Sequence, residues 1–159
     1  MRFTDLGPLS IGAVPKPDLL VALERAGVRL NDYARALFAD PAFTTSAEAN
    51  TVALVQVSLP DIGLPDGGRF DEILAKAAAL GLAPCPLEVG PHLRLSDVDQ
   101  PKGPYLTVAS LEPRPGTETP NGFYLRHLDD GRWLRGYEAG PENIYPPDFT
   151  DFVFVRHEH

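Results

Sequence analysis

Apolar residues in the first part of the chain recur at the three- and four-residue spacing of amphipathic helices. This spacing predicts two short helices, over residues 17–26 and 31–39, that pack together as a helical hairpin. Residues 1–16 are interrupted by two glycines and two prolines and follow no helical period. We therefore expect an irregular N-terminal arm, or at most one short edge strand.

The middle of the chain combines one extended and one helical pattern. The run TVALVQVSL at residues 51–59 is apolar on both faces apart from Gln56, which predicts a strand covered on both sides. From Phe70 onward, apolar residues recur at i, i+3, i+4, i+7 and i+8 until Gly81. This is the clearest helical pattern in the chain.

The second half is a succession of short extended runs separated by turns. The Asp-Gly pair at residues 130–131 predicts a tight hairpin, because two-residue hairpin turns need positive φ. Five runs carry strand-forming residues: His92–Ser96, Tyr105–Ser110, Phe123–Leu128, Arg132–Tyr137 and Phe152–Arg156. We predict an α+β fold in a single domain over residues 1–159: an N-terminal helical hairpin, one strand and an amphipathic helix, and then a C-terminal antiparallel β-meander, with residues 157–159 as a flexible tail.

Composition and charge narrow the range of partners. The 22 acidic residues exceed the 14 basic ones, which gives 159 residues a net charge of −8. This charge disfavours nucleic acid and anionic membranes, and it favours a basic protein partner. The single cysteine excludes an internal disulfide and a multi-cysteine zinc site. Without a signal peptide or an apolar run of membrane-spanning length, we expect a cytoplasmic protein with no metal and no other cofactor.

The Pro-rich segment 84–104 holds the densest group of chemically versatile residues. Proline restricts the backbone, so we predict a rigid loop, either a stiff connection or a binding site. Cys85, Glu88 and His92 would suit a cysteine-dependent hydrolase or transferase if the thiol is ionised beside a base. The Pro-Cys-Pro setting equally suits a buried, inert thiol. The Asp-x-Asp sequence at residues 97–99 is more typical of a turn than of a metal site.

Arg94 is expected to tie this segment to the meander. Strand alternation turns Leu93 and Leu95 to one face and Arg94 to the other. The planar guanidinium suits a bidentate pair with a carboxylate. We predict a buried Arg94 paired with Glu88 or Asp99.

The hairpin over residues 123–137 is a second candidate surface. Alternation places Tyr124 and Arg126 on one face of the first strand, and Trp133 and Arg135 on one face of the second. Trp, Tyr and Arg are the residue types enriched in binding hot spots. The alternative is that Trp133 lies in the core and the arginines pair with the abundant acidic residues.

Recognisable catalytic motifs are missing from the chain, which contains no P-loop, GxGxxG, HExxH or GxSxG sequence. We therefore expect a non-enzymatic module that binds a protein partner through the segment 84–104 and the hairpin 123–137. The predicted contact residues are Glu88, Arg94, Asp99, Gln100, Tyr124, Arg126, Trp133 and Arg135. The alternative is a small cysteine-dependent hydrolase or transferase centred on Cys85, Glu88 and His92.

Three phrases, AGVRLNDYARALFADPAF, CPLEVGPHLRLSDVDQPKG and NGFYLRHLDDGRWLRGY, occur in this order. Over about residues 17–156 the chain resembles a family of small bacterial proteins of uncharacterised function. The resemblance implies a shared domain but no activity. Some members bear a helicase label, which conflicts with the missing P-loop and the acidic charge. The positions that match the central phrase are Cys85, Glu88, Gly90, Pro91, Arg94, Asp99 and Gln100, whereas His92 replaces a glutamine-like amide.

Overall fold

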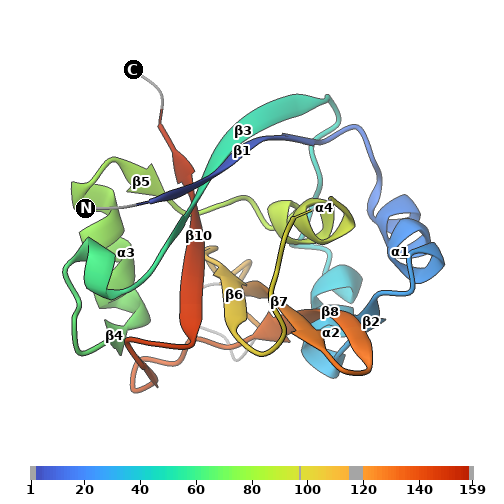
Figure 1. Cartoon of the computed structure of the whole chain (residues 1–159). Helices are drawn as coiled ribbons and strands as arrows, with labels where there is room; N and C mark the ends of the chain where they lie inside the picture. Colours follow the sequence, from blue (N-terminus) through green and yellow to red (C-terminus); the bar gives the residue numbers. More distant parts are fainter. Residues whose placement is uncertain (1–2, 97, 115–119, 158–159) are drawn as a thin grey trace.

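The computed structural model describes residues 3–96, 98–114 and 120–157, and it is built around an eight-stranded mixed sheet (Figure 1). The strand order is β1-β3-β10-β6-β7-β8-β2, and β5 pairs with β10 outside this path. These strands are β1 (Thr4–Ile11), β2 (Arg29–Leu30), β3 (Asn50–Val57), β5 (Leu82–Ala83), β6 (Tyr105–Val108), β7 (Gly122–Leu128), β8 (Gly131–Tyr137) and β10 (Thr150–Arg156). A separate two-stranded sheet joins β4 (Gly68–Arg69) to β9 (Ile144–Tyr145).

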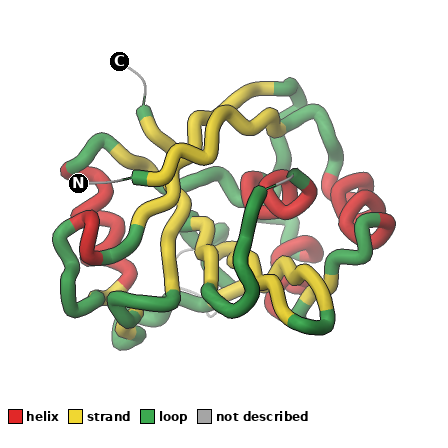
Figure 2. The backbone as a smooth tube through the Cα atoms, in the orientation of Figure 1, coloured by secondary structure: helices red, strands yellow, loops and turns green. Residues whose placement is uncertain are grey.

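Helices cover both faces of the large sheet (Figure 2). They are α1 (Lys16–Arg25), α2 (Asp32–Ala39), α3 (Phe70–Ala79) and α4 (Val89–Leu95), with a short 3-10 helix η1 (Pro60–Ile62). On one face, α1, α2 and α4 enclose a core that includes Leu23, Phe38 and Phe123. On the other face, α3 packs over β3 and β10, where Ile73 and Phe152 are fully buried. The part of this second face formed by β7 and β8 lies beside α3 rather than under it (Figure 1).

The predicted order of a helical hairpin followed by an antiparallel meander is wrong. The sheet mixes strands from both ends of the chain: β10 lies between β3, which is antiparallel to it, and β6, which is parallel to it. Only β6, β7 and β8 form the expected antiparallel run. The helices α1 and α2 are separated by β2, and α1 packs on α4 whereas α2 packs on β8. Strand pairing across the whole chain length leaves no trace in local periodicity, and the helices follow the sheet.

The prediction of an irregular arm at residues 1–16 is also wrong for most of that segment. β1 pairs antiparallel with β3 along its full length and forms one edge of the sheet. Its register shifts between Asp5 and Gly7, where the glycine has a φ of 76° and its N–H donates to the Asp5 carboxylate at 2.7 Å. This bulge breaks the alternation, and a bulge on an edge strand also discourages pairing with other chains.

The strand predicted over His92–Ser96 is a helix, and the loop predicted over residues 84–104 contains it. Val89 and Leu93 lie one helical turn apart and are both buried in the core. The proline at position 91 falls in the first turn, where its missing N–H costs nothing. A Cβ at Gly90 would lie 2.7 Å from the Phe123 Cβ, so the glycine permits the close packing of α4 on β7.

No helix in the described part of the chain is both long enough and apolar enough to cross a membrane.

Candidate binding surface

The hairpin of β7 and β8 gathers aromatic and arginine side chains on one face. Tyr124 pairs directly with Arg135, and Arg126 pairs directly with Trp133. Residues opposite one another in an antiparallel pair project to the same face, so these four side chains form one continuous patch. Tyr105 extends the patch onto β6, because its ring lies 5.4 Å from that of Tyr124. We call these five residues the hairpin surface.

Each arginine of the hairpin surface stacks on an aromatic ring. The Arg126 Cζ lies 4.0 Å from the centre of the Tyr105 ring, and the Arg135 Cζ lies 4.2 Å from that of Trp133. A third arginine, Arg29 of β2, reaches the Trp133 ring at 5.9 Å. Stacking of this kind contributes about 0.5–2 kcal/mol and holds a guanidinium in a fixed plane. The arrangement therefore presents its cations in defined positions.

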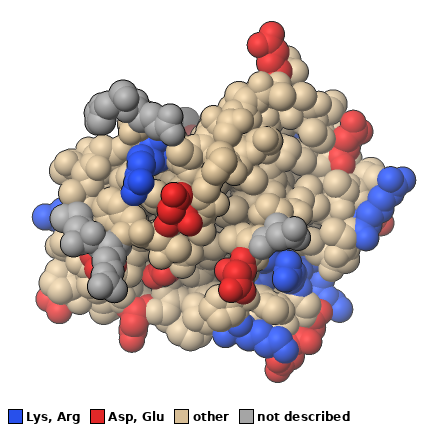
Figure 3. All heavy atoms as spheres, turned by 45° about the horizontal axis from the view of Figure 1, so that its top comes forward, with Lys and Arg blue, Asp and Glu red and all other residues tan. Residues whose placement is uncertain are grey.

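None of these arginines is neutralised by a carboxylate. Within the described residues, Arg29, Arg126 and Arg135 form no ion pair within 4.0 Å, although acidic residues outnumber basic ones along the chain. Asp130 in the hairpin turn accepts instead from the Trp133 Nε1 at 2.9 Å, and its main-chain oxygen accepts from the Arg29 Nε at 3.0 Å. On the face shown in Figure 3, basic side chains gather mainly at the lower right, interleaved with acidic ones. The predicted pairing of the hairpin arginines with acidic residues is thus absent from the described residues.

A cavity of about 710 Å³ adjoins the Trp133 end of the hairpin surface. Half-buried apolar side chains of α1, β2 and the connection between them contribute to its walls, together with exposed charged ones. The lining residues used below are Leu20, Val28, Arg29, Leu30, Arg35 and Trp133. The cavity thus combines an apolar wall with two arginines.

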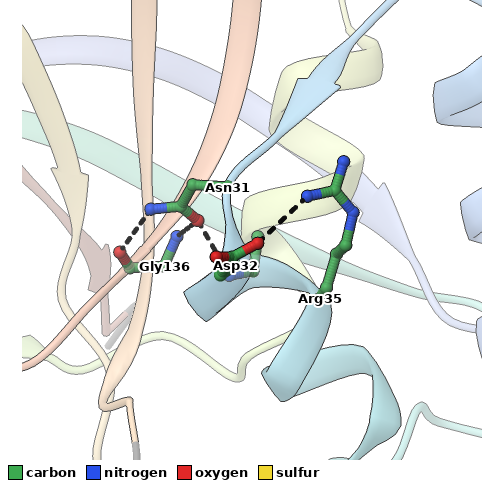
Figure 4. Close-up of polar contacts among 5 residues, drawn as sticks. Asn31, Asp32, Arg35 and Gly136 are labelled. Atoms are coloured by element: carbon green, nitrogen blue, oxygen red, sulfur yellow. Dashed lines mark hydrogen bonds and ion pairs between the residues drawn. The ribbon is translucent and has the colours of Figure 1, made fainter.

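The side chain of Asn31 fixes this end of the surface (Figure 4). Its Oδ1 accepts hydrogen bonds from the main-chain N–H groups of Ala34 and Gly136, both at 2.8 Å. Its Nδ2 donates to the Gly136 carbonyl at 3.2 Å. One side chain therefore caps α2 and also pairs with the backbone of β8 as a neighbouring strand would. In the same view, Asp32 faces Arg35 in an exposed ion pair of 3.5 Å.

Arg94 lies beneath the hairpin, on the side opposite the stacked rings. Only 2% of its surface is exposed, which confirms the predicted burial. The predicted carboxylate partners are wrong: its Nη1 donates to the Gln100 Oε1 at 2.8 Å and to the carbonyls of Arg126 and Trp133 at 3.3 and 3.5 Å. Arg94 therefore braces the backbone of the same residue pair whose side chains stack on the far face.

The remaining donors of Arg94 explain its electrostatics. Its Nε and Nη2 are buried and have no hydrogen-bond partner in the described part of the protein. Burial lowers the pKa of Arg94 to about 10, and the nearby positive charge of Arg132 lowers it further. The guanidinium stays charged at neutral pH. Gln100 completes the brace, because its Nε2 donates to the Leu125 carbonyl at 2.8 Å.

The other predicted contact residues of segment 84–104 lie apart from the hairpin surface. Glu88 is buried and accepts from the Ser46 hydroxyl at 2.9 Å and from the Ser46 N–H at 3.2 Å. It holds the connection between α2 and β3 against α4. Asp99 is exposed and lines a different cavity. The structure thus brings together Arg94 and Gln100 below the hairpin and Tyr124, Arg126, Trp133 and Arg135 above it.

The residues of the cysteine-dependent alternative do not form a nucleophilic site. Cys85 is 3% exposed, its Sγ donates to the Val153 carbonyl at 3.5 Å, and burial raises the pKa of the thiol far above its ordinary value. Burial also lowers the pKa of His92, an effect that the Glu88 carboxylate partly offsets. The thiol is therefore protonated at neutral pH and enclosed by protein, whereas catalysis needs an accessible thiolate. No group of three or more metal-ligating side chains occurs among the described residues.

Sequence reasoning missed two members of this region. Tyr105 begins a predicted strand, but the pairing of β6 with β7 is needed to place it beside Arg126. Arg29 lies in a strand of two residues, which is too short to produce a pattern. The only available signal was the alternation that placed Tyr105 and Thr107 on one face.

Comparisons with known protein families, with curated proteins and with solved structures give no match.

Proposed function

We propose that this protein is a non-enzymatic binding module whose hairpin surface binds an acidic segment of a protein partner. The observation that carries the proposal is the set of stacked arginines without carboxylate partners in a chain of net charge −8. An acidic segment would supply the missing carboxylates, and arginine binds these groups in a planar, bidentate geometry. The stacked rings would keep the guanidinium planes in position before the partner arrives.

This partner differs from the basic one that net charge favours. Net charge acts at long range and is screened beyond about 8–10 Å at physiological ionic strength. At the docking surface, the local charges decide which groups are paired, and here they are positive. The remaining acidic surface would help to exclude non-specific binding to nucleic acid.

The cavity beside Trp133 gives the segment a second requirement. Its half-buried Leu20, Val28 and Leu30 would accept an apolar side chain, and Arg29 and Arg35 lie in the same lining for carboxylates on either side of it. A partner segment with an aliphatic residue among several glutamates or aspartates fits this combination. Segment 84–104 would contribute through the brace of Arg94 and Gln100 below the hairpin rather than by direct contact.

Trp133 offers a direct test, because it is the only tryptophan in the chain. We would titrate the protein with poly-L-glutamate, poly-L-lysine and single-stranded oligothymidylate at physiological salt and record tryptophan emission. We expect a saturable change with poly-L-glutamate alone. A response to poly-L-lysine or oligothymidylate alone would overturn the acidic-partner proposal.

Two variants locate the response. Arg135→Ala removes the stacked cation and should weaken the poly-L-glutamate response about tenfold or more. The matched control is Arg156→Ala on β10, because Arg156 also approaches an aromatic ring, that of Phe3, at 5.9 Å. Equal effects of the two variants would show that general charge, and not the hairpin surface, binds the polymer.

A further inference from the structure

A second cavity, of about 290 Å³, lies where β3, β10 and β6 meet the connection between α4 and β6. Its lining includes two carboxylates, two glutamine side chains and two aromatic rings: Gln56, Asp99, Gln100, Tyr105, Phe149 and Asp151. It differs from the cavity beside Trp133, whose lining carries arginines. The two cavities have opposite electrostatic character.

Gln56 and Asp151 are polar residues on the inner strands of the sheet. Gln56 was the single bulky polar residue in its apolar run, and its Nε2 donates to the Asp151 Oδ2 at 2.8 Å. Strand alternation places Asp151 on the same face as the fully buried Val153. The half-buried carboxylate is therefore directed to the cavity side of the sheet, where an unneutralised charge is costly.

Neither carboxylate is neutralised by the protein. In the described ranges, Asp99 and Asp151 form no ion pair within 4.0 Å with a basic side chain. The nearest cation with a stated position is Arg126, which stacks on Tyr105 4.0 Å from the ring centre. The lining itself therefore contains two negative charges and no positive one.

Aromatic rings form another wall of the cavity. Tyr105 and Phe149 lie 5.8 Å apart at an interplanar angle of 69°, and Phe149 is 56% exposed. Aromatic rings beside carboxylates attract organic cations, because the ring faces carry negative potential and the rings also contact alkyl groups. Arg126 on Tyr105 already uses this attraction within the protein.

We infer that this cavity binds an organic cation of the size of a lysine or arginine side chain. Its ammonium or guanidinium group is held by Asp151 and Asp99, and its alkyl chain packs against Tyr105 and Phe149. The same chemistry is offered by a free alkyl amine and by a basic side chain of a protein. The site does not depend on the acidic partner proposed for the hairpin surface.

Isothermal titration calorimetry with agmatine, with a glycine-arginine-glycine peptide blocked at both ends, and with glutarate tests the inference. We expect saturable binding of one or both cations and none of glutarate. Tighter binding of agmatine identifies a free-amine site, and tighter binding of the peptide identifies a side-chain site. No saturable binding of either cation, or equal binding of glutarate, overturns the inference.

The Asp151→Asn variant assigns the binding to this cavity. The asparagine can still accept the hydrogen bond from Gln56, so the packing is kept while the charge is removed. We expect cation affinity to fall about tenfold or more, because a charge-assisted hydrogen bond is lost. The matched control, Asp66→Asn, removes the same charge from an exposed loop and should change nothing. Unchanged cation affinity in Asp151→Asn, or an equal loss in Asp66→Asn, refutes the site.

Two further measurements keep the result interpretable. If Asp151→Asn fails to fold, Asp99→Asn removes the exposed carboxylate of the same cavity, and an unchanged affinity there refutes the site. The response of Trp133 to poly-L-glutamate should be unchanged in both variants. Loss of cation binding with that response intact separates this inference from the proposed function.

Discussion

Replacing Asn31 tests how firmly the hairpin surface is attached to the helical side of the molecule. Its side chain makes three hydrogen bonds, one to the first turn of α2 and two to Gly136 in β8. Asn31→Ala removes all three. Asn31→Asp keeps an oxygen for the two N–H donors but places a second oxygen against the Gly136 carbonyl.

The expected magnitudes follow from these contacts. Loss of an N-cap costs about 1 kcal/mol. Gly136 is buried, and leaving its N–H and C=O without partners adds about 1–3 kcal/mol. We therefore predict that Asn31→Ala lowers the free energy of unfolding by about 3 kcal/mol. For Asn31→Asp we predict about 1–2 kcal/mol, because only the donor is lost.

Urea unfolding followed by circular dichroism measures both values against wild type. The control is Asn50→Ala, because Asn50 is exposed and its side chain makes only a long local hydrogen bond to Glu48 at 3.4 Å. We expect that control to change stability by less than about 0.5 kcal/mol. If Asn31→Ala unfolds at the same urea concentration as Asn50→Ala, the attachment of β8 through Asn31 is refuted.

Three further predictions concern the packing below the hairpin and the buried thiol. Gly136→Ala should cost at least about 2 kcal/mol in thermal unfolding, because a Cβ there would lie 2.6 Å from the Tyr33 carbonyl carbon and 2.8 Å from the Ala34 nitrogen; wild-type stability would refute this packing. Arg94→Ala should cost about 3 kcal/mol in urea, and Arg94→Met distinctly less, since the methionine refills the space and removes a buried charge that no carboxylate neutralises; equal losses would refute that reasoning. Because burial raises the folded pKa of Cys85, the folded thiol keeps its proton above about pH 8.5 while the unfolded one loses it, so stability falls as pH rises. Between about pH 9 and 10, wild type should lose about 1.4 kcal/mol more than Cys85→Ala, and parallel pH profiles would contradict the buried thiol.

Local patterns predicted most of the individual elements but not their arrangement. The periodicity of the helices α1, α2 and α3 and the extended run of β3 all correspond to observed elements. The central position of β10, between β3 and β6, depends on contacts between residues about a hundred positions apart, such as Gln56 and Val153. Nothing in a local period specifies which strand pairs with which.

The failure at α4 has a different physical cause. Leu93 and Leu95 alternate with polar residues as in a strand, and two prolines precede them. The i, i+4 pair of Val89 and Leu93 indicates a helix equally well, and burial against β7 decided between the two periods. Short runs remain ambiguous because tertiary packing outweighs their intrinsic preference.

The candidate surface was predictable only as far as alternation reaches. Alternation placed the aromatic and arginine side chains of β7 and β8 correctly within each strand. The role of Arg94 was not predictable, because its acceptors are main-chain carbonyls and the Gln100 amide rather than the carboxylates that charge pairing favoured. A pattern of residue types gives no information about main-chain acceptors.

The most direct test of the central claim is the affinity of the hairpin surface for one defined acidic segment. The probe is a fluorescein-labelled peptide of two leucines flanked on each side by three glutamates, followed by fluorescence anisotropy at physiological salt. We predict saturable binding to wild type and to Arg156→Glu, and binding weakened at least about tenfold in Arg135→Glu. Equal binding by Arg135→Glu and Arg156→Glu, or no saturable binding to wild type, would contradict the claim that unpaired arginines on this hairpin recognise an acidic partner.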